Sequence, residues 1–295
     1  MISIITINYN QPDATRAFLH SCRELTGPER EIIVVDNASQ NPPDAAFQAD
    51  FPEVTFILSP QNLGFAGGNN LGIQAAKGDY FCFLNNDVIT TPDLLEKLLN
   101  TLKNHPDAGG VSPVIHYINP PGVIQYAGYT QINPWTGRNH AIGKGQPDTG
   151  QYHSTMHTAY LHGAAMMVGR AVVEKTGSMP EVFFLYYEEL DWCEQMRRKG
   201  FELLVEPTAL VFHHASLSVG GESTLWTYYY NRNRILFMKR NTSGFQFAFF
   251  LVYFYSMVVP RTALRYLFSG KTLHIKALLR ALREVPDKTG PSNNF

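Results

Sequence analysis

The stretch YFCFLNNDV, from Tyr80 to Val88, places two amides and a carboxylate directly after a run of apolar residues. The run Tyr80–Leu84 has the length and the aromatic content of a buried β-strand. Buried polar groups cost free energy unless they are paired, so Asn85, Asn86 and Asp87 need partners. They form either a turn that begins the next helix or a site that uses one carboxylate with short polar neighbours.

Strands of this kind alternate with helix-like segments over residues 1–100. Each short apolar run is followed by a segment whose apolar residues recur at helical spacing. This β-α-β rhythm predicts an α/β fold with a mostly parallel sheet flanked by helices. The expected strands cover residues 2–7, 31–35, 54–58 and 80–84, and the expected helices cover 13–25, 69–77 and 92–104, the last with Thr90 or Thr91 as N-cap.

Polar residues follow each of these expected strands. They are Thr6 and Asn8 after the first, DNAS (36–39) after the second, NLGFAGGNN (62–70) after the third and NND (85–87) after the fourth. Ligands of such sheets bind at the carboxyl ends of the strands. Polar endings that share one edge therefore favour a binding site there over unrelated turns.

The rest of the chain divides into a loop-rich segment, a second ordered segment and a tail. Residues 105–160 predict loops with short strands near 109–115 and 126–132. Further helices are expected over 170–177 and from 188 to 200, and further strands over 201–205 and 209–212. The apolar run 245–259 is shorter than the roughly 20 residues of a membrane-spanning helix, and Pro260 is expected to end it. These patterns predict a main domain, residues 1–240, and an apolar, basic helical tail, residues 241–295.

Composition and charge restrict the partners. The chain is 44% hydrophobic and carries a net charge of −1, which argues against a general nucleic-acid-binding protein. Residues 241–295 carry seven Lys and Arg and two acids, a net charge of +5, which leaves −6 on residues 1–240. A basic amphipathic helix over 271–284 suits an anionic lipid surface, and packing on the main domain or a homodimer contact would explain it equally.

Two features indicate a cytoplasmic protein. Cys22, Cys82 and Cys193 form no CxxC pair, so they favour reduced thiols over a zinc site or a disulfide framework. The N-terminal MISIITINYN has neither a basic segment nor a long apolar run, so it is not expected to be a signal peptide. Peripheral contact of the basic tail with the inner face of the cell membrane is compatible with this location.

The glycine-rich stretch NLGFAGGNNLG, residues 62–72, has the composition of a phosphate-binding loop that leads into a helix. Glycines permit positive φ angles and a close backbone approach to a ligand, and a helix N-terminus favours phosphate. The stretch is neither GxGxxG nor GxxxxGK[ST], so neither a dinucleotide-binding fold nor a P-loop ATPase is indicated. The alternative is a glycine-rich loop without a ligand.

Two acids and a histidine pair stand at expected strand ends. Asp36 could accept from a base N–H or a ribose hydroxyl, or it could stabilise a turn. Asp87 suits Mg²⁺ or Mn²⁺, hard cations that prefer oxygen ligands, or it could cap the next helix. His213 and His214 suit a metal or a phosphate, although histidine pairs are more often structural.

A second acidic cluster follows the apolar run FFLYY. Glu188, Glu189 and Asp191 fall within four residues, and like charges this close raise at least one pKa. Acids also complement the dipole at a helix N-terminus, which is the structural alternative. The helix dipole does not explain why the apolar run FFLYY precedes these acids. The run therefore favours a pocket in which the acids lie.

Eight motifs follow one another along about residues 2–240. They are SIITINYN, VVDNAS, NLGFAGGNNLGI, AKGDYFCFLNNDV, HGAAMMV, FFLYYEELDWCEQMRRKG, VFHHASLS and YYYNRNRILFMKRN. In this order they resemble the motifs of the family 2 glycosyltransferases with a GT-A fold, especially the bacterial rhamnosyltransferase-like members. The resemblance implies inverting transfer of a sugar from a nucleotide sugar to an acceptor hydroxyl.

The resemblance implies roles for individual residues. Asp87 is similar to the last acid of the family's metal-binding Asp-x-Asp, whose first position is Asn85 here. The run Glu188-Glu189-Leu190-Asp191 is similar to the family's Glu-Asp-x-Asp, so Glu189 resembles the catalytic base. His213 resembles a further metal or diphosphate contact, with His214 as the second choice. The donor-binding residues implied are Thr6, Asn8, Asp36 (which resembles the reader of the base), Asn62, Gly64, Gly67, Gly68, Asn69, Asn85 and Asn86.

Substrates and two other functions stay open at this stage. The motifs fit dTDP-rhamnose and UDP-sugars alike, and the basic, apolar tail suggests a lipid-linked glycan as acceptor. A sugar nucleotidyltransferase is a less favoured alternative. Such enzymes carry a Gly-rich loop with a basic residue directly after the first strand, where this chain has INYN (7–10). A non-catalytic binder of nucleotide sugars or glycans is the other alternative, which product formation would distinguish.

Overall fold

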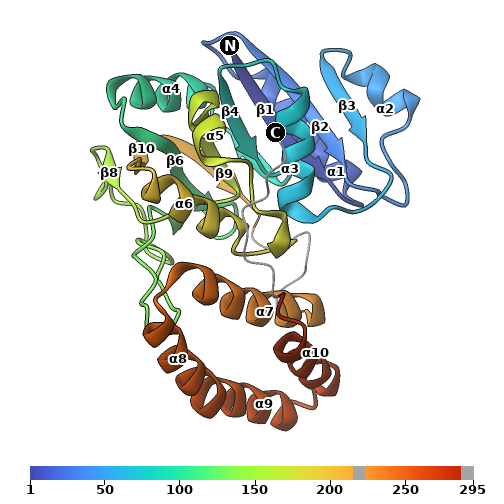
Figure 1. Cartoon of the computed structure of the whole chain (residues 1–295). Coiled ribbons are helices and arrows are strands. Elements are labelled where there is room, and N and C mark those ends of the chain that lie inside the picture. The colour runs from blue at the N-terminus through green and yellow to red at the C-terminus, as the bar shows by residue number, and fades with distance from the viewer. Residues whose placement is uncertain (215–222, 287–295) are drawn as a thin grey trace.

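The computed structural model describes residues 1–214 and 223–286 and contains a ten-stranded sheet with helices on both faces (Figure 1). This confirms the predicted α/β class with a helical extension at the C-terminal side. The strands are β1 (Ile2–Asn8), β2 (Arg30–Asp36), β3 (Val54–Leu58), β4 (Tyr80–Leu84), β5 (Val88–Thr90), β6 (Ala108–Tyr117), β7 (Ile124–Tyr126), β8 (Met156–His157), β9 (Ala165–Gly169) and β10 (Glu202–His213). The helices are α1 (Pro12–Arg23), α2 (Ala45–Asp50), α3 (Gly64–Ala75), α4 (Leu94–Asn104), α5 (Arg170–Thr176), α6 (Glu188–Arg198), α7 (Thr224–Asn241), α8 (Gly244–Tyr253), α9 (Val259–Phe268) and α10 (Thr272–Arg283), with a 3₁₀ turn η1 (Glu181–Phe183) and a π-helical turn η2 (Phe254–Val258).

The main path of the sheet follows the order β3-β2-β1-β4-β9-β6-β10-β5. The first four strands in this order, β3, β2, β1 and β4, are all parallel to one another. Strand β9 is antiparallel to β4 and to β6. Strand β10 is parallel to β6 and antiparallel to β5. The carboxyl ends of β1, β2, β3, β4, β6 and β10 therefore share one edge, as the polar strand endings predicted.

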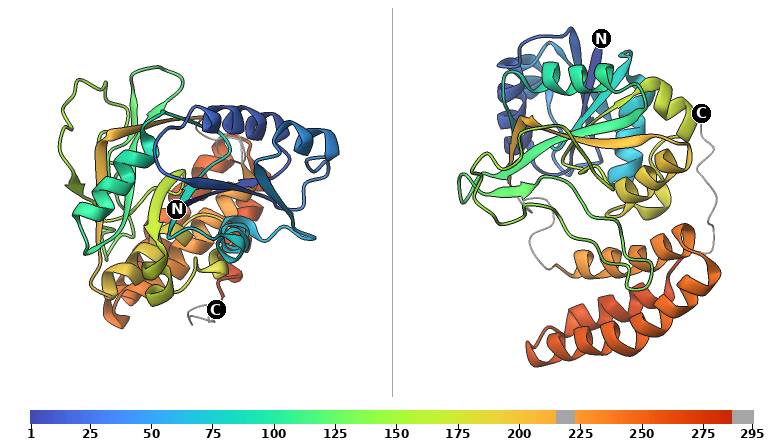
Figure 2. Two further views of the ribbon diagram at one scale, coloured as in Figure 1. Left: turned by 90° about the horizontal axis from the view of Figure 1, so that it is seen from above. Right: turned by 90° about the vertical axis from the view of Figure 1, so that its left-hand side faces the viewer.

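Side chains of the central strands are buried on both faces, which explains their continuous apolar sequences. Ile4 and Cys82 belong to the core that α1, α2 and α4 cover. Ile5 and Phe83 belong to the core that α3, α5 and α6 cover, and the Phe83 ring meets that of Trp192 on α6 at 5.8 Å between centroids. Period-two alternation of large apolar residues thus holds a helical layer on each face (Figure 2).

Several predicted boundaries in the sheet domain are wrong. Helix α4 begins at Leu94 with Asp93 at the N-cap position, in place of Thr90 or Thr91. Helix α3 begins at Gly64 rather than at Asn69, so the glycine-rich stretch lies largely within the helix. The strand expected over 126–132 is wrong, because β7 ends at Tyr126. The residues that follow form an isolated bridge, Tyr129 with Ala141, and backbone hydrogen bonds such as Thr130 N to His140 O (3.0 Å). The strands expected over 201–205 and 209–212 form one strand, β10, with a shift of register between Glu206 and Leu210.

Pro260 does not end the apolar helix, contrary to the prediction. One continuous helix runs over Gly244–Phe268, 25 residues, and by length and composition alone it would suffice to cross a membrane. Pro260 lies inside this continuous helix, directly after the π-helical turn η2. The preceding π-helical turn η2 absorbs the change of hydrogen-bond register.

Helices α7 to α10 form an arc beside the sheet (Figures 1 and 2). Helix α10 packs against α7, and the Thr227 and Tyr266 hydroxyls, 3.0 Å apart, join α7 to α9. The division into residues 1–240 and 241–295 stays a prediction. Residues 215–218 of the VFHHASLS motif and the charged Asp287 and Lys288 lie outside the described residues.

Candidate active site

Asp87 and His213 come together because β5 runs antiparallel to β10. The NND turn leads from β4 into β5, and Val88 pairs with His213 in the sheet. Asp87 Oδ1 lies 3.1 Å from His213 Nε2, and both side chains are buried. His214 donates its backbone N–H to the Asp87 carbonyl (3.1 Å), which fixes the turn. The sheet thus joins two expected cation ligands that lie far apart in the sequence.

The donor set of this pair fits a divalent cation. His213 Nδ1 lies 3.0 Å from Gln125 Oε1, and His213 Nε2 faces Asp87 Oδ1. Asp87 Oδ1 is buried and has no hydrogen-bond partner. A carboxylate oxygen and an imidazole nitrogen can both bind a divalent cation, and a metal-bound histidine ordinarily engages its other ring nitrogen in a hydrogen bond, as Nδ1 does with Gln125. No group of three or more His, Cys, Asp or Glu side chains gathers within residues 1–214 and 223–286, so ligand or water oxygens would complete the coordination.

His162 extends the site from this pair toward the acidic cluster. Its ring lies 6.2 Å from the His213 ring and is stacked on Tyr129 at 5.8 Å, both measured between centroids. His162 Nδ1 accepts from Ala164 N (3.1 Å), so Nε2 carries the proton. Burial and then the neighbouring His213 lower the pKa of His162 to about 3, so the ring is neutral near pH 7. The sequence predicted no role for His162, although the HGAAMMV motif that contains it was a signal.

Glu189 lies in the first turn of α6, beside this histidine motif. A Cβ on Gly163 would lie 3.7 Å from Glu189 Cγ, so the residue after His162 runs along the Glu189 side chain. Glu189 Oε2 is buried without a hydrogen-bond partner. Burial raises the pKa of Glu189 from 4.5 to about 7. Burial and then the charge of Glu189 raise the pKa of Tyr129, which puts the carboxylate near the ring stacked on His162. Such a carboxylate suits a general base at neutral pH.

The other two acids of the cluster differ from Glu189 in their surroundings. Glu188 is buried, and burial together with the charge of Glu189 raises its pKa well above the ordinary value. The Asp191 carboxylate accepts from Arg240 Nε (2.9 Å) and Nη2 (3.0 Å) and from Asn241 (2.7 Å). Arg240 and Asn241 of α7 thus engage both oxygens of Asp191 and join α6 to α7, and the expected catalytic role of Asp191 stays a prediction.

The turn before α6 holds three aromatic residues in the left-handed region of backbone angles. Phe184, Tyr186 and Tyr187 have φ angles of 66°, 67° and 75°. Leu185 N donates to Phe183 O (2.8 Å) and closes a γ-turn of the rare, strained kind around Phe184. Each such residue costs on the order of 1–3 kcal/mol and persists only where its surroundings impose it.

Asn233, fully buried on α7, imposes this conformation. Its Nδ2 lies 2.8 Å from Phe183 O, 2.7 Å from Leu185 O and 2.8 Å from Tyr186 O. Arg232 supports it, since Nη2 donates to Phe183 O (2.8 Å) and Nε donates to Asn233 Oδ1 (2.8 Å). No role was predicted for either residue, although both belong to the YYYNRNR motif. Helix α7 therefore sets the direction in which Glu188 and Glu189 enter the site.

A buried hydrogen-bond network joins the polar ends of β1, β2 and β4. Asn8 Nδ2 donates to Asp36 Oδ2 (2.6 Å), and Asn8 Oδ1 accepts from Thr15 Oγ1 (2.8 Å). Asn86 Nδ2 donates to the same Thr15 oxygen (2.9 Å), while Asp36 Oδ1 accepts from Ser39 N (3.0 Å). The amide of Asn86 thus has a partner, and Asn85 is the more exposed amide of the NND turn.

Asn37, which the sequence did not single out, fixes the loop before α3. Its side chain donates to Asn62 Oδ1 (3.1 Å) and Gly64 O (2.9 Å) and accepts from Leu63 N (2.9 Å). Gly64 has a φ of +72°, and a Cβ there would lie 2.1 Å from Phe184 O. The predicted donor loop therefore touches the strained turn that precedes Glu188.

Other residues of the expected donor set pack instead. A Cβ on Gly68 would lie 2.8 Å from Ile7 Cδ1, and one on Gly67 would lie 2.6 Å from Leu63 Cβ, so these glycines let α3 approach β1 and its own loop. Asn69 donates to Phe65 O within α3 (3.1 Å). These three residues therefore have packing roles in the structure, and their expected donor contacts stay a prediction. Thr6 Oγ1 is buried and has no hydrogen-bond partner.

Comparisons with known proteins identify the family of this chain. The family described as Glycosyl transferase family 2 matches residues 3–174. The chain is 27% identical over 300 residues to the low-salt glycan biosynthesis hexosyltransferase Agl10 of Haloferax volcanii, which covers 98% of this chain and 92% of the relative. It is 24% identical over 271 residues to the N-acetylglucosaminyl-diphospho-decaprenol L-rhamnosyltransferase of Mycobacterium tuberculosis, which covers 83% of this chain and 86% of the relative.

Solved structures share the GT-A fold. GalNAc-T7 with UDP, GalNAc and Mn²⁺ is similar with a TM-score of 0.66 at 16% identity, covering 81% of this chain and 48% of that chain. Mannosyltransferase PcManGT from Pyrobaculum calidifontis, in complex with GDP-Man and Mn²⁺, has a TM-score of 0.59 at 17% identity, covering 96% of this chain and 74% of that chain. The sheet, the order of the motifs along it and the family match over residues 3–174 lead to one conclusion: the chain belongs to the family 2 glycosyltransferases.

Proposed function

We propose that this protein is an inverting glycosyltransferase that moves a sugar from a nucleoside-diphosphate sugar to a hydroxyl of a glycan or lipid-linked glycan. The observation that carries the proposal is Glu189, a buried carboxylate with a pKa of about 7 that His162 and Tyr129 connect to the Asp87–His213 pair. A hexosyltransferase and an L-rhamnosyltransferase among the relatives support dTDP-rhamnose or a UDP-sugar as donor. The proposed location is the cytoplasm, at the inner face of the cell membrane.

In the proposed reaction the acceptor oxygen attacks the anomeric carbon on the face opposite the diphosphate. The new C–O bond forms while the bond to the diphosphate oxygen breaks, and the nucleoside diphosphate leaves with the bonding electron pair. Glu189 takes the proton of the attacking hydroxyl. A single displacement of this kind inverts the configuration of the anomeric carbon, and the fixed position of both substrates lowers the barrier.

Asp87 and His213 are the residues that would hold Mg²⁺ or Mn²⁺. The ion, when bound, acts as a Lewis acid that offsets the charge on the departing diphosphate. Two structural neighbours that were solved with Mn²⁺ support this assignment. The Asn8–Asp36 network and the loop from Asn62 to Gly64 would bind the nucleotide at the sheet edge.

A donor screen tests the proposed substrate class. One nucleotide sugar with Mn²⁺ is expected to raise the melting temperature of the protein, because a ligand at about 100 times its Kd stabilises the folded state by roughly 2.7 kcal/mol. Asp87→Ala should lose the metal-dependent part of the shift. Asp107→Ala, which removes an exposed acid elsewhere, should retain it. Failure of every UDP-, dTDP- and GDP-sugar to stabilise the wild-type protein would overturn the proposed donor class.

Transfer is expected to depend on pH through Glu189. Its pKa is about 7 in the folded protein, so the base is protonated at lower pH and kcat/KM should rise with pH to a plateau above that value. The free energy of unfolding should change with pH in the opposite direction to kcat/KM. A carboxyl whose pKa rises from 4.5 on folding contributes its full stabilisation below pH 4.5 and loses it as the pH approaches 7. A kcat/KM that stays constant between pH 5 and 9 would refute Glu189 as the base.

A further inference from the structure

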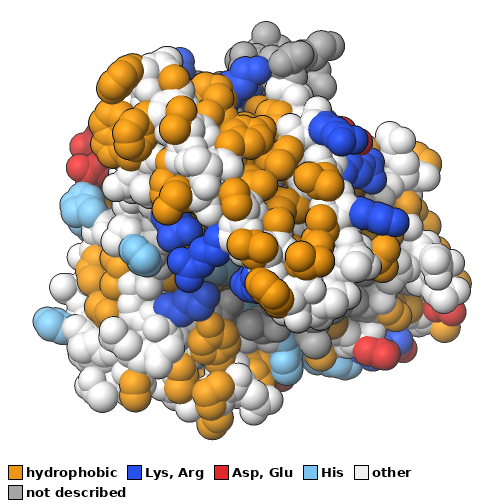
Figure 3. Space-filling model, turned by 90° about the horizontal axis from the view of Figure 1, so that it is seen from below, with side chains coloured by type: hydrophobic (Ala, Val, Ile, Leu, Met, Phe, Trp, Pro, Cys, Tyr) orange, Lys and Arg blue, Asp and Glu red, His pale blue; other side chains and the backbone are white. Residues whose placement is uncertain are grey.

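The continuous helix α8–η2–α9 exposes an unusually apolar surface. Among the described residues, ten of the sixteen exposed large hydrophobic side chains lie on it or on the adjoining α10. Figure 3 shows apolar side chains covering much of this face of the molecule, with Lys and Arg side chains gathered beside them. A patch of this kind marks a surface that binds a membrane or a partner. Its members are Phe245, Phe249, Val252, Tyr255, Met257, Leu264, Leu267, Phe268, Leu273 and Leu279.

The helix is placed to lie along a membrane surface rather than to cross it. Helices α7 and α10, which precede and follow it, pack against each other, so both of its ends stay on the side of the sheet domain (Figure 1). The Tyr228 hydroxyl donates to Glu284 (2.7 Å) and ties the chain after α10 to α7. The basic side chains of α9 and α10, among them Arg261 and Lys276, are exposed and suit anionic headgroups.

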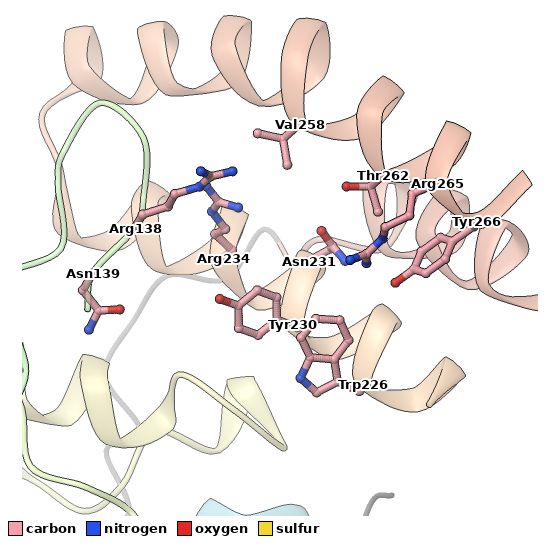
Figure 4. Close-up of a pocket in the computed structure, with 10 residues that line it drawn as sticks. All are labelled: Arg138, Asn139, Trp226, Tyr230, Asn231, Arg234, Val258, Thr262, Arg265 and Tyr266. Carbon is pink, nitrogen blue, oxygen red and sulfur yellow. The ribbon is translucent and has the colours of Figure 1, made fainter. Parts of the chain in front are cut away.

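A cavity of about 270 Å³ lies between this helix and α7. Its ten lining residues include three arginines, Arg138, Arg234 and Arg265, and none of the lining residues that the structure describes is acidic. Figure 4 shows Arg138 and Arg234 pointing toward each other, with Arg265 reaching toward Asn231 from the opposite helix. Guanidinium groups that converge on one space favour an anion, and their fork-like geometry matches phosphate.

Arg234 shows that this cavity has unused hydrogen-bonding capacity. Its side chain is only 4% exposed, and one nitrogen donates to the Thr136 carbonyl. Its Nε is buried without a hydrogen-bond partner. The rings of Phe250 and Phe254 lie 5.8 Å and 5.2 Å from its guanidinium carbon and hold the group in place. An unpaired buried donor is costly, and an anionic oxygen would satisfy it.

Tyr230 connects the cavity to the active site. It lines the cavity, and its ring lies 5.6 Å from that of Tyr187, the residue directly before Glu188. Tyr230 and Glu189 are also both close enough to Tyr129 to affect its pKa, although burial has the larger effect. An anionic group in the cavity would therefore lie near the proposed base.

We propose that this cavity binds the phosphate or diphosphate of a lipid carrier that bears the acceptor sugar, while the apolar face of α8–η2–α9 lies at the membrane with the carrier's chain. The inference rests on the proposed glycosyltransferase function and specifies its acceptor. The basic cavity recognises the headgroup, the apolar face contacts the hydrocarbon, and Tyr230 marks the path from the headgroup to Glu189.

Vesicle binding tests this proposal. The probe is phosphatidylcholine vesicles that contain a polyprenyl diphosphate, compared with vesicles matched in charge by phosphatidylglycerol. The wild-type protein should prefer the diphosphate vesicles. Arg138→Gln and Arg265→Gln should each weaken this preference by about tenfold, because each removes one charge-assisted hydrogen-bonding group. Arg261→Gln, which removes the same charge from α9 outside the cavity lining, should preserve the preference.

Two further measurements separate the sources of the phosphate and the two proposals. Inorganic pyrophosphate should compete weakly; if it bound as tightly as the diphosphate vesicles, the cavity would recognise a soluble diphosphate and the lipid assignment would be overturned. The donor-induced rise in melting temperature is measured on the same proteins. If the donor response is present and the cavity variants keep the vesicle preference, only the cavity assignment is refuted. If the donor response is absent, the proposed function itself fails.

Discussion

Glu189→Gln is expected to reduce kcat by about three orders of magnitude while the affinity for the nucleotide sugar stays within roughly a factor of two. Glutamine has the size of glutamate and can make the same backbone contacts, but it cannot take the proton of the acceptor hydroxyl. The donor-induced rise in melting temperature should therefore persist in a protein that no longer forms product. Isothermal titration with the donor and a product assay measure the two quantities separately.

Stability distinguishes a lost base from a damaged fold. Burial raises the pKa of Glu189 to about 7, so at pH 8 the native protein carries a carboxylate whose charge is disfavoured. Glutamine removes that cost, and the variant should melt at a higher temperature than the wild type at pH 8. Glu174→Gln, the same exchange at an exposed position of α5, should change neither kcat nor melting temperature. Full turnover by Glu189→Gln would eliminate Glu189 as the base.

Asn233→Asp is expected to lower kcat by roughly a hundredfold, because displacement of a catalytic group by about 1 Å has effects of that size. The exchange alters no volume, so it opens no cavity. It replaces a donating amide with an oxygen that faces the carbonyls of Phe183, Leu185 and Tyr186. The left-handed turn should relax, and the carboxylates of Glu188 and Glu189 should move with it. We also expect the free energy of unfolding to fall by about 3 kcal/mol, since the new charge is buried.

Readouts other than stability show whether Asn233 positions the base. The pH midpoint of kcat/KM should move away from about 7, because relaxation of the turn changes the burial of Glu189. Asn233→Ser, which stays neutral and keeps one donor, should give an intermediate effect on kcat. Asn100→Asp at an exposed site of α4 controls for the chemical change. A destabilised Asn233→Asp protein with normal kcat and an unchanged pH midpoint would assign Asn233 to folding alone.

Local patterns determined the strands and the edge at which the site lies. A parallel strand buried on both faces must be continuously apolar, which is why β4 was predicted with its observed bounds. The carboxyl ends of parallel strands meet at one edge whatever the loops do, so the network of Asn8, Asp36 and Asn86 followed from the polar strand endings. The eight sequence motifs likewise predicted the family that the comparison confirmed.

Helix boundaries at glycine and proline were misjudged because packing overrode propensity. Gly64 and Gly68 disfavour a helix in isolation, but their missing side chains let α3 approach Phe184 and Ile7. Pro260 breaks an ordinary helix, yet the π-helical turn before it accommodates the missing donor. Neither compensation has a local sequence signal.

By itself the sequence determined the α/β class, the functional edge of the sheet and the acids to consider, because these depend on periodicity and on residue types. The surroundings of each acid, by contrast, depend on the tertiary structure. Asp191 is engaged by Arg240 and Asn241 of α7, whereas Glu189 is left buried with an unpaired oxygen. The pairing of Asp87 with His213 depends on the antiparallel placement of β5 beside β10. A side chain's charge and partners are set by burial and by neighbours remote in the chain, and those exist only once the layers have packed.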